Sequence, residues 1–169
     1  MSLAELLAAV LILGLVGTAM TGGVSAAARS FARSLRASEA EELYTDLQTI
    51  LANELRYTTE ITLKNGSEVD TFFSNTYAIK NARTYLAALD DDGAETDYGQ
   101  LALGAGGEYN RLLGRAAYPH KLGAAAKVFY DAAGNVFTVQ LTISANGTPY
   151  LSDRSFQVRP VNEVTVSTE

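Results

Sequence analysis

Residues 6–28 read LLAAVLILGLVGTAMTGGVSAAA, and no charged side chain interrupts the chain between Glu5 and Arg29. As an α-helix, a run of this length spans about 35 Å, more than the roughly 30 Å hydrocarbon core of a bilayer. A cleaved secretory signal fits poorly, because no basic residue precedes the run and the run is too long for the apolar part of a signal. The run therefore predicts an N-terminal membrane-crossing helix.

Glu5 is the feature that a simple anchor does not explain. A carboxylate near the centre of a bilayer costs roughly 2.5–3.5 kcal/mol, so such a residue usually has a function and a partner. One candidate partner is the positive α-amino group of Met1 in a neighbouring copy, which would set the register between copies. The alternative is that Glu5 lies in interfacial water, near a helix N-terminus whose dipole favours an anion. Physical arguments leave both open.

The chain opens MSLAELLAAVLILGLV, with Glu at the fifth position heading the charge-free run. This opening resembles the mature N-terminus of type IV pilins and pseudopilins. The likeness covers the first 16 residues in motif and about the first 55 in character. It implies that numbering starts at a processed end, where a prepilin peptidase has removed a basic leader and N-methylated Met1. The residues that match the family pattern are Met1, Ser2, Leu3, Glu5, Leu6 and Gly14.

Three arginines follow the apolar run directly, at Arg29, Arg33 and Arg36. By the positive-inside rule they would hold the C-terminal side of the helix in the cytoplasm. A pilin needs the opposite orientation before assembly. Basic residues of a removed leader would therefore have to outweigh these arginines.

The family's proline near position 22 is missing, and four glycines stand in this part of the chain instead. Glycine weakens a helix by up to about 1 kcal/mol relative to alanine. We therefore expect residues 14–23 to be melted or extended in a filament, although an isolated subunit in a membrane would be helical there. Close packing of helices through small residues is the alternative. The glycines are Gly14, Gly17, Gly22 and Gly23.

From residue 29 to 57 the pattern becomes amphipathic, which predicts one helix over about residues 2–57. The stripe is expected to pack on a head domain, since heptad regularity is not sustained. The predicted organisation is a filament-core or membrane half at 1–28, a packing half at 29–57 and a β-rich head at 58–169. The apolar stripe comprises Phe31, Leu35, Leu43, Leu47, Ile50, Leu51 and Leu55.

After Tyr57 the residues favour strands and turns. Asn65-Gly66 predicts a hairpin, residues 80–90 a short helix, and the Gly/Ala-rich stretch to about residue 125 an irregular region. Residues 127–158 predict a three-stranded antiparallel meander with turns at AAGN and Asn146-Gly147, and residues 161–166 an edge strand. The alternating residues Phe137, Val139, Leu141 and Ile143 should cover the stalk. The predicted class is α+β: the ladle or lollipop fold of pilins, with a long helical stalk and a small antiparallel head.

Charge and composition limit the chemistry. The 13 basic and 19 acidic residues give a net charge of −6, which argues against a basic patch that binds nucleic acid. Cysteine is absent, which excludes thiolate chemistry and disulfides. His120 is the only histidine and has no evident catalytic or metal partner, so no enzyme is predicted.

An acidic cluster around Gly93 is the one candidate metal site. Oxygen ligands at this spacing could hold Ca²⁺, but the match to an EF-hand loop fails, and a solvated acidic loop is the alternative. The candidate ligands are Asp90, Asp92, Glu95 and Asp97. No other cofactor is expected.

These observations favour a structural pilin that polymerises with copies of itself into an extracellular filament for adhesion, motility or DNA uptake. Before assembly it would be a single-pass membrane protein that meets a prepilin peptidase and an assembly platform. One alternative is a pseudopilin of a type II secretion or competence apparatus. The other is a membrane-anchored domain that binds calcium or another ligand and does not polymerise.

Overall fold

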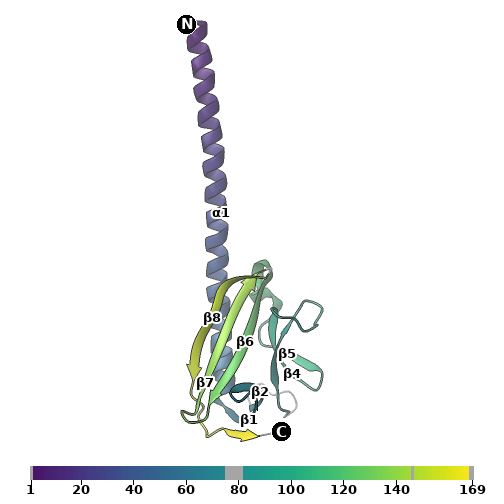
Figure 1. Cartoon of the computed structure of the whole chain (residues 1–169). Helices are drawn as coiled ribbons and strands as arrows, with labels where there is room; N and C mark the ends of the chain where they lie inside the picture. The colour runs from purple at the N-terminus through teal and green to yellow at the C-terminus, as the bar shows by residue number, and fades with distance from the viewer. Residues whose placement is uncertain (1, 75–81, 146, 168–169) are drawn as a thin grey trace. The chain divides into compact units, whose positions relative to one another are not determined.

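The computed structural model describes residues 2–74, 82–145 and 147–167, and the chain is α+β (Figure 1). It divides into two compact units, Met1–Ser38 and Glu39–Glu169. The elements are α1 (Leu3–Arg56), β1 (Thr58–Lys64), β2 (Glu68–Ser74), β3 (Tyr85–Leu89), β4 (Gln100–Ala105), β5 (Glu108–Arg111), the 3₁₀ turns η1 (Arg115–Ala117) and η2 (Pro119–Lys121), β6 (Leu122–Asp131), β7 (Val136–Ala145), β8 (Thr148–Val158) and β9 (Thr165–Ser167).

The first unit is the N-terminal part of α1. No proline interrupts it, and it is rich in Ala and Leu, the strongest helix formers. Every side chain described between residues 2 and 38 is exposed. Phe31 and Leu35, which belong to the expected stripe, are exposed by 71% and 43%.

The second unit builds its core on the last turns of α1. Ala40, Leu43, Leu47, Leu51 and Leu55 recur every three or four residues and are almost completely buried. The helix ends where β-branched residues begin, and the N–H of Val161 donates to the exposed carbonyl of Arg56 (2.9 Å). The buried stripe of the helix therefore begins at Ala40.

The larger sheet has six strands in the order β8-β7-β6-β2-β1-β9. Figure 1 shows β6, β7 and β8 side by side, and they form the predicted antiparallel meander. Phe137, Val139, Leu141 and Ile143 on β7 are fully buried, in the same apolar cluster as the helix leucines. The prediction that this face of the strand covers the helix is confirmed for the turns from residue 40 onward.

Local turn signals identified two hairpins correctly. Asn65 and Gly66 have φ of 55° and 86°, the left-handed conformation that these residue types tolerate, and they join β1 to β2. The loop from Ala132 to Asn135 joins β6 to β7, and Asn135 is also left-handed, with φ of 46°. Gly147 has φ of 76° at the turn before β8, whereas Asn146 lies outside the described residues.

The head is not wholly antiparallel, because β9 pairs with β1 in parallel. The edge strand predicted over 161–166 begins four residues later than expected, because residues 161–164 are not in a strand and β9 covers Thr165–Ser167. Glu60 on β1 accepts hydrogen bonds from Ser167 Oγ (2.6 Å) and from the Arg83 guanidinium. Those two donors, first the hydroxyl and then the guanidinium, lower the pKa of Glu60.

A second sheet, in the order β3-β4-β5, corrects two predictions. Residues 85–89 form a strand instead of part of a helix over 80–90, of which residues 80 and 81 lie outside the described ranges. The stretch expected to be irregular contains β4, β5 and the start of β6. Helix propensity in YLAAL is overridden, because Ala87 and Leu89 are buried and pair across to the fully buried strand β4.

Gly104 lies where the side chains of the two neighbouring strands leave no room for a Cβ atom. It faces Tyr85 on β3 and Tyr109 on β5 in register, and an added Cβ would lie 2.7 Å from the Tyr85 ring. Both phenol groups donate to Glu95 Oε1, at 3.1 Å from Tyr85 and 2.7 Å from Tyr109. The hydrogen bond with Tyr85, and next that with Glu95, raises the pKa of Tyr109.

Candidate assembly surface

Ser2 and Glu5 form a reciprocal cap at the start of α1. The backbone N–H of Ser2 donates to Glu5 Oε2 (2.8 Å), and the N–H of Glu5 points back to Ser2 Oγ (3.4 Å). This is a capping box: the carboxylate satisfies the Ser2 N–H at the helix start, and the Glu5 N–H is shared between Ser2 Oγ and the Ser2 carbonyl (3.1 Å). Sequence analysis did not identify it, although Ser-x-x-Glu before an apolar run is its signature.

The cap leaves Glu5 able to accept a further donor. The carboxylate has two oxygens with room for about four hydrogen bonds, and the cap uses one position on Oε2. Among the residues that the structure describes, no cation pairs with Glu5. Met1, the other half of the expected pair, lies outside them.

The first unit presents apolar side chains to every side. Helices that are apolar all round are stable in a membrane or a protein core, not in water. Within the described ranges, α1 is the one helix long and apolar enough to cross a membrane. The large exposed side chains before Arg29 are Leu3, Leu6, Leu7, Val10, Leu11, Ile12, Leu13, Leu15, Val16, Met20 and Val24.

The four stalk glycines lie in continuous helix in the single chain. A Cβ added at Gly14, Gly17, Gly22 or Gly23 would meet nothing within 4 Å, so no contact inside the chain requires glycine there. Side-chain hydroxyls in this stretch donate hydrogen bonds to backbone carbonyls of the preceding turn; Thr21 Oγ1, for example, donates to the carbonyl of Thr18 (2.9 Å). The predicted melting concerns the filament and stays a prediction.

The carboxylates of the acidic loop around Gly93 accept hydrogen bonds from different partners and do not converge on one point. Asp90 Oδ1 accepts from the N–H groups of Asp92 (3.0 Å) and Ala94 (2.8 Å), and Asp91 accepts from Arg115 Nη2 (2.8 Å). Glu95 is held by the two tyrosines described above. Over the described ranges, no group of three or more Asp, Glu, His or Cys side chains is placed to hold a metal ion. The structure therefore does not bring Asp90, Asp92, Glu95 and Asp97 together into one ligand set.

His120 contacts the helix, which the sequence did not indicate. Its Nδ1 lies 2.8 Å from Glu39 Oε2, and its backbone is left-handed with φ of 51°. Lys121 follows with φ of 59°, so two successive non-glycine residues carry backbone strain. The hydrogen bond between His120 and Glu39 ties this strained turn to α1.

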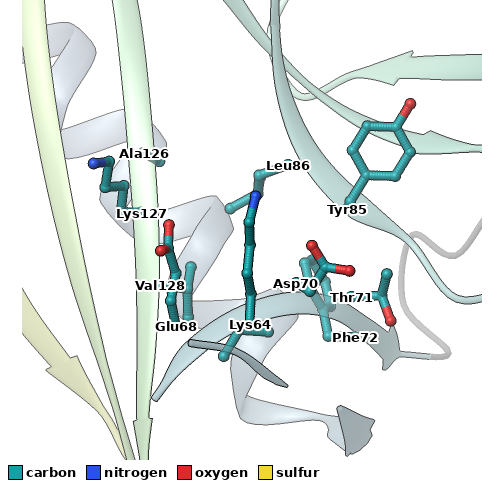
Figure 2. Close-up of a pocket in the computed structure, with 11 residues that line it drawn as sticks. Lys64, Glu68, Asp70, Thr71, Phe72, Tyr85, Leu86, Ala126, Lys127 and Val128 are labelled. Carbon is teal, nitrogen blue, oxygen red and sulfur yellow. The ribbon is translucent and has the colours of Figure 1, made fainter. Parts of the chain in front are cut away.

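A cleft of about 340 Å³ opens between β2 and β6 (Figure 2). It forms because the two strands pair through a single position, Glu68 opposite Phe129. Its rim carries both signs of charge, from Lys64, Lys127, Glu68 and Asp70. No histidine lines it, and nothing in it indicates one chemical class of ligand.

Comparisons of the chain with protein-family models, curated proteins and solved structures found no match. Its function must therefore be inferred from its own residues.

Proposed function

We propose that this chain is a structural subunit of a type IV pilus, which polymerises through its N-terminal helix into an extracellular filament. Filaments of this type serve adhesion, motility or DNA uptake. Before assembly the subunit resides in the membrane as a single-pass protein, where a prepilin peptidase and an assembly platform act on it. The long N-terminal helix followed by a mixed sheet supports the proposal, because this layout is consistent with that of pilins.

One observation carries the proposal: an apolar helix half, exposed on all sides, starts with a single carboxylate. The apolar surface requires a membrane or other protein around it. A membrane alone gives the carboxylate no favourable partner, whereas a neighbour's terminal ammonium does. A parallel array of copies supplies both the apolar surroundings and that ammonium.

The test compares Glu5→Ala with Ser2→Ala in cells that produce the chain. Glu5→Ala should insert into the membrane at normal level and form no filaments, because the neighbour's ammonium loses its partner. Ser2→Ala removes the hydroxyl of the cap but keeps the carboxylate. It should therefore cost only the roughly 0.5–2 kcal/mol of a helix cap and leave filaments intact. Membrane fractionation and electron microscopy of sheared surface material measure both.

Abundant normal filaments from Glu5→Ala would contradict the proposal. Equal loss of filaments from both variants would show that Glu5 acts through capping and not through pairing. Assemblies of this chain that never exceed short rods would favour the pseudopilin alternative. A chain that stays monomeric in its membrane, with Glu5 replaceable without effect, would favour the anchored binding domain.

A further inference from the structure

One face of the N-terminal part of α1 carries three exposed arginines. Arg29, Arg33 and Arg36 are spaced by four and three residues, which places them on one side of a helix. All three are exposed, and none forms an ion pair within the described part of the chain. They directly follow the apolar run, so a neighbouring subunit in a filament lies within their reach.

A groove in the second unit carries the opposite charge. It has a volume of about 110 Å³ and lies between α1 and the turns η1 and η2. Glu39, Glu42 and Asp46 line it from α1, spaced by three and four residues. The facing wall contains Ala116 and Ala117, which leave room for a long side chain.

Two of the three acids in the groove have no cationic partner among the described residues. Glu39 meets His120, but no ion pair of Glu42 or Asp46 is found over residues 2–74, 82–145 and 147–167, and both are exposed. The two units also differ in net charge: residues 1–38 are net positive and residues 39–169 are net negative. Residues 1–38 contain three basic residues and one acid, which leaves 10 basic and 18 acidic residues, a formal charge of −8, in residues 39–169.

We propose that the arginine face of one copy docks in the acidic groove of a second copy. This inference rests on the proposed polymerisation and names one of its contacts. The first and last member of each set are seven positions apart, about 10.5 Å of helix, so the two sets match in length, with Glu39 shared between an arginine and His120. Salt bridges between exposed side chains fix register more than they add affinity.

The spacing also predicts the axial offset between the two copies. Arg29 and Glu39, Arg33 and Glu42, and Arg36 and Asp46 are separated by nine or ten residues, about 15 Å of helix. Pairing of Glu5 with the next copy's first residue corresponds to only about 6 Å. The two contacts therefore join each subunit to different neighbours around the filament.

The absence of cysteine allows a direct test. In the full-length variant Arg33→Cys plus Glu42→Cys, the two thiols of one copy are separated by about 13 Å of helix, beyond the reach of a disulfide. Any disulfide between these positions must therefore join two copies. Oxidised filaments should give a ladder of multimers on a non-reducing gel, because each subunit contributes one thiol to each of two neighbours.

Matched variants provide the controls. Each single cysteine should give dimers at most, and Arg33→Cys with Asp70→Cys, at an exposed acid of β2, should give no ladder. Charge reversal is the second measurement: Arg33→Glu should lower filament yield by about tenfold or more, and adding Glu42→Arg should restore it.

Filaments that form normally but give no ladder, together with failure of Glu42→Arg to restore yield, would overturn the docking contact and leave the pilus proposal standing. Loss of binding to vesicles of anionic lipid in the arginine variants, with filament yield unchanged, would assign the arginines to lipid headgroups and also overturn it. A wild-type chain that forms no filaments would contradict the proposed function itself.

Discussion

At the scale of single residues, Tyr118 links the segment before β6 to strand β4. Its hydroxyl accepts the backbone N–H of Leu101 at 3.0 Å, and its side chain is 7% exposed. Burial raises the pKa of Tyr118 to about 12, although the hydrogen bond from Leu101 acts in the opposite direction. The folded state therefore holds this proton more tightly than the unfolded state does.

We predict that Tyr118 by itself lowers the free energy of unfolding by about 2–3 kcal/mol as the pH rises from about 10, the unfolded pKa, to about 12. Tyr118→Phe should flatten this decline. At neutral pH it should cost about 1 kcal/mol, because Leu101 loses its acceptor. Urea unfolding of the full chain in detergent at several pH values measures both effects. An unchanged alkaline slope would contradict the assignment, and exposed Tyr57→Phe is the control.

The sequence was sufficient to identify Glu5 as a candidate functional residue, but its hydrogen bonds were not predicted. Its position at the head of an uncharged run was sufficient to single it out. The capping box with Ser2 was also readable from the sequence, because it depends on residues three positions apart. The hydrogen bond between His120 and Glu39 was not, because it joins positions 81 residues apart.

At the scale of elements, the glycine-containing part of α1 is predicted to have two conformations. The single chain is helical through residues 14–23, and each glycine position has room for a methyl group. Replacing Gly14, Gly17, Gly22 and Gly23 with Ala should therefore increase helix stability in the isolated subunit, by up to about 1 kcal/mol per site. If filaments require this stretch to extend, the same change should reduce their number.

Circular dichroism of the detergent-solubilised variant and filament counts by electron microscopy test this pair of effects. Ala26→Gly and Ala27→Gly, placed outside the stretch, are the opposite control and should lower helicity. Normal filaments whose stalks stay helical from residue 14 to 23 would show that the glycines serve close packing instead.

Turns and strands whose sequence pattern lies within a few residues were predicted correctly. Strands whose conformation depends on pairing with a segment far along the chain were not. The Asn65-Gly66 turn and the β6–β8 meander follow from turn chemistry and alternation within a few residues. Strand β3 has the composition of a helix, and its conformation depends on β4, whose paired residues lie 11 to 19 positions later. The cleft between β2 and β6 could not be foreseen either, because it results from strands that pair at one position only.

At the scale of the whole molecule, the two units differ in apolar exposure and in net charge. Residues 1–38 carry the exposed apolar surface and a net positive set of side chains, and residues 39–169 carry the core and a charge of −8. The first unit leaves its apolar side chains exposed, and Glu42 and Asp46 of the second have no ion pair among the described residues. Copies arranged side by side with an axial offset would satisfy both.

Immunogold labelling of intact cells with an antibody against residues 39–169 tests this central claim most directly. The account predicts gold along the full length of surface filaments, with the chain as their main component by mass spectrometry. Label scattered over the cell envelope, together with a chain that leaves the membrane only as a monomer, would contradict it.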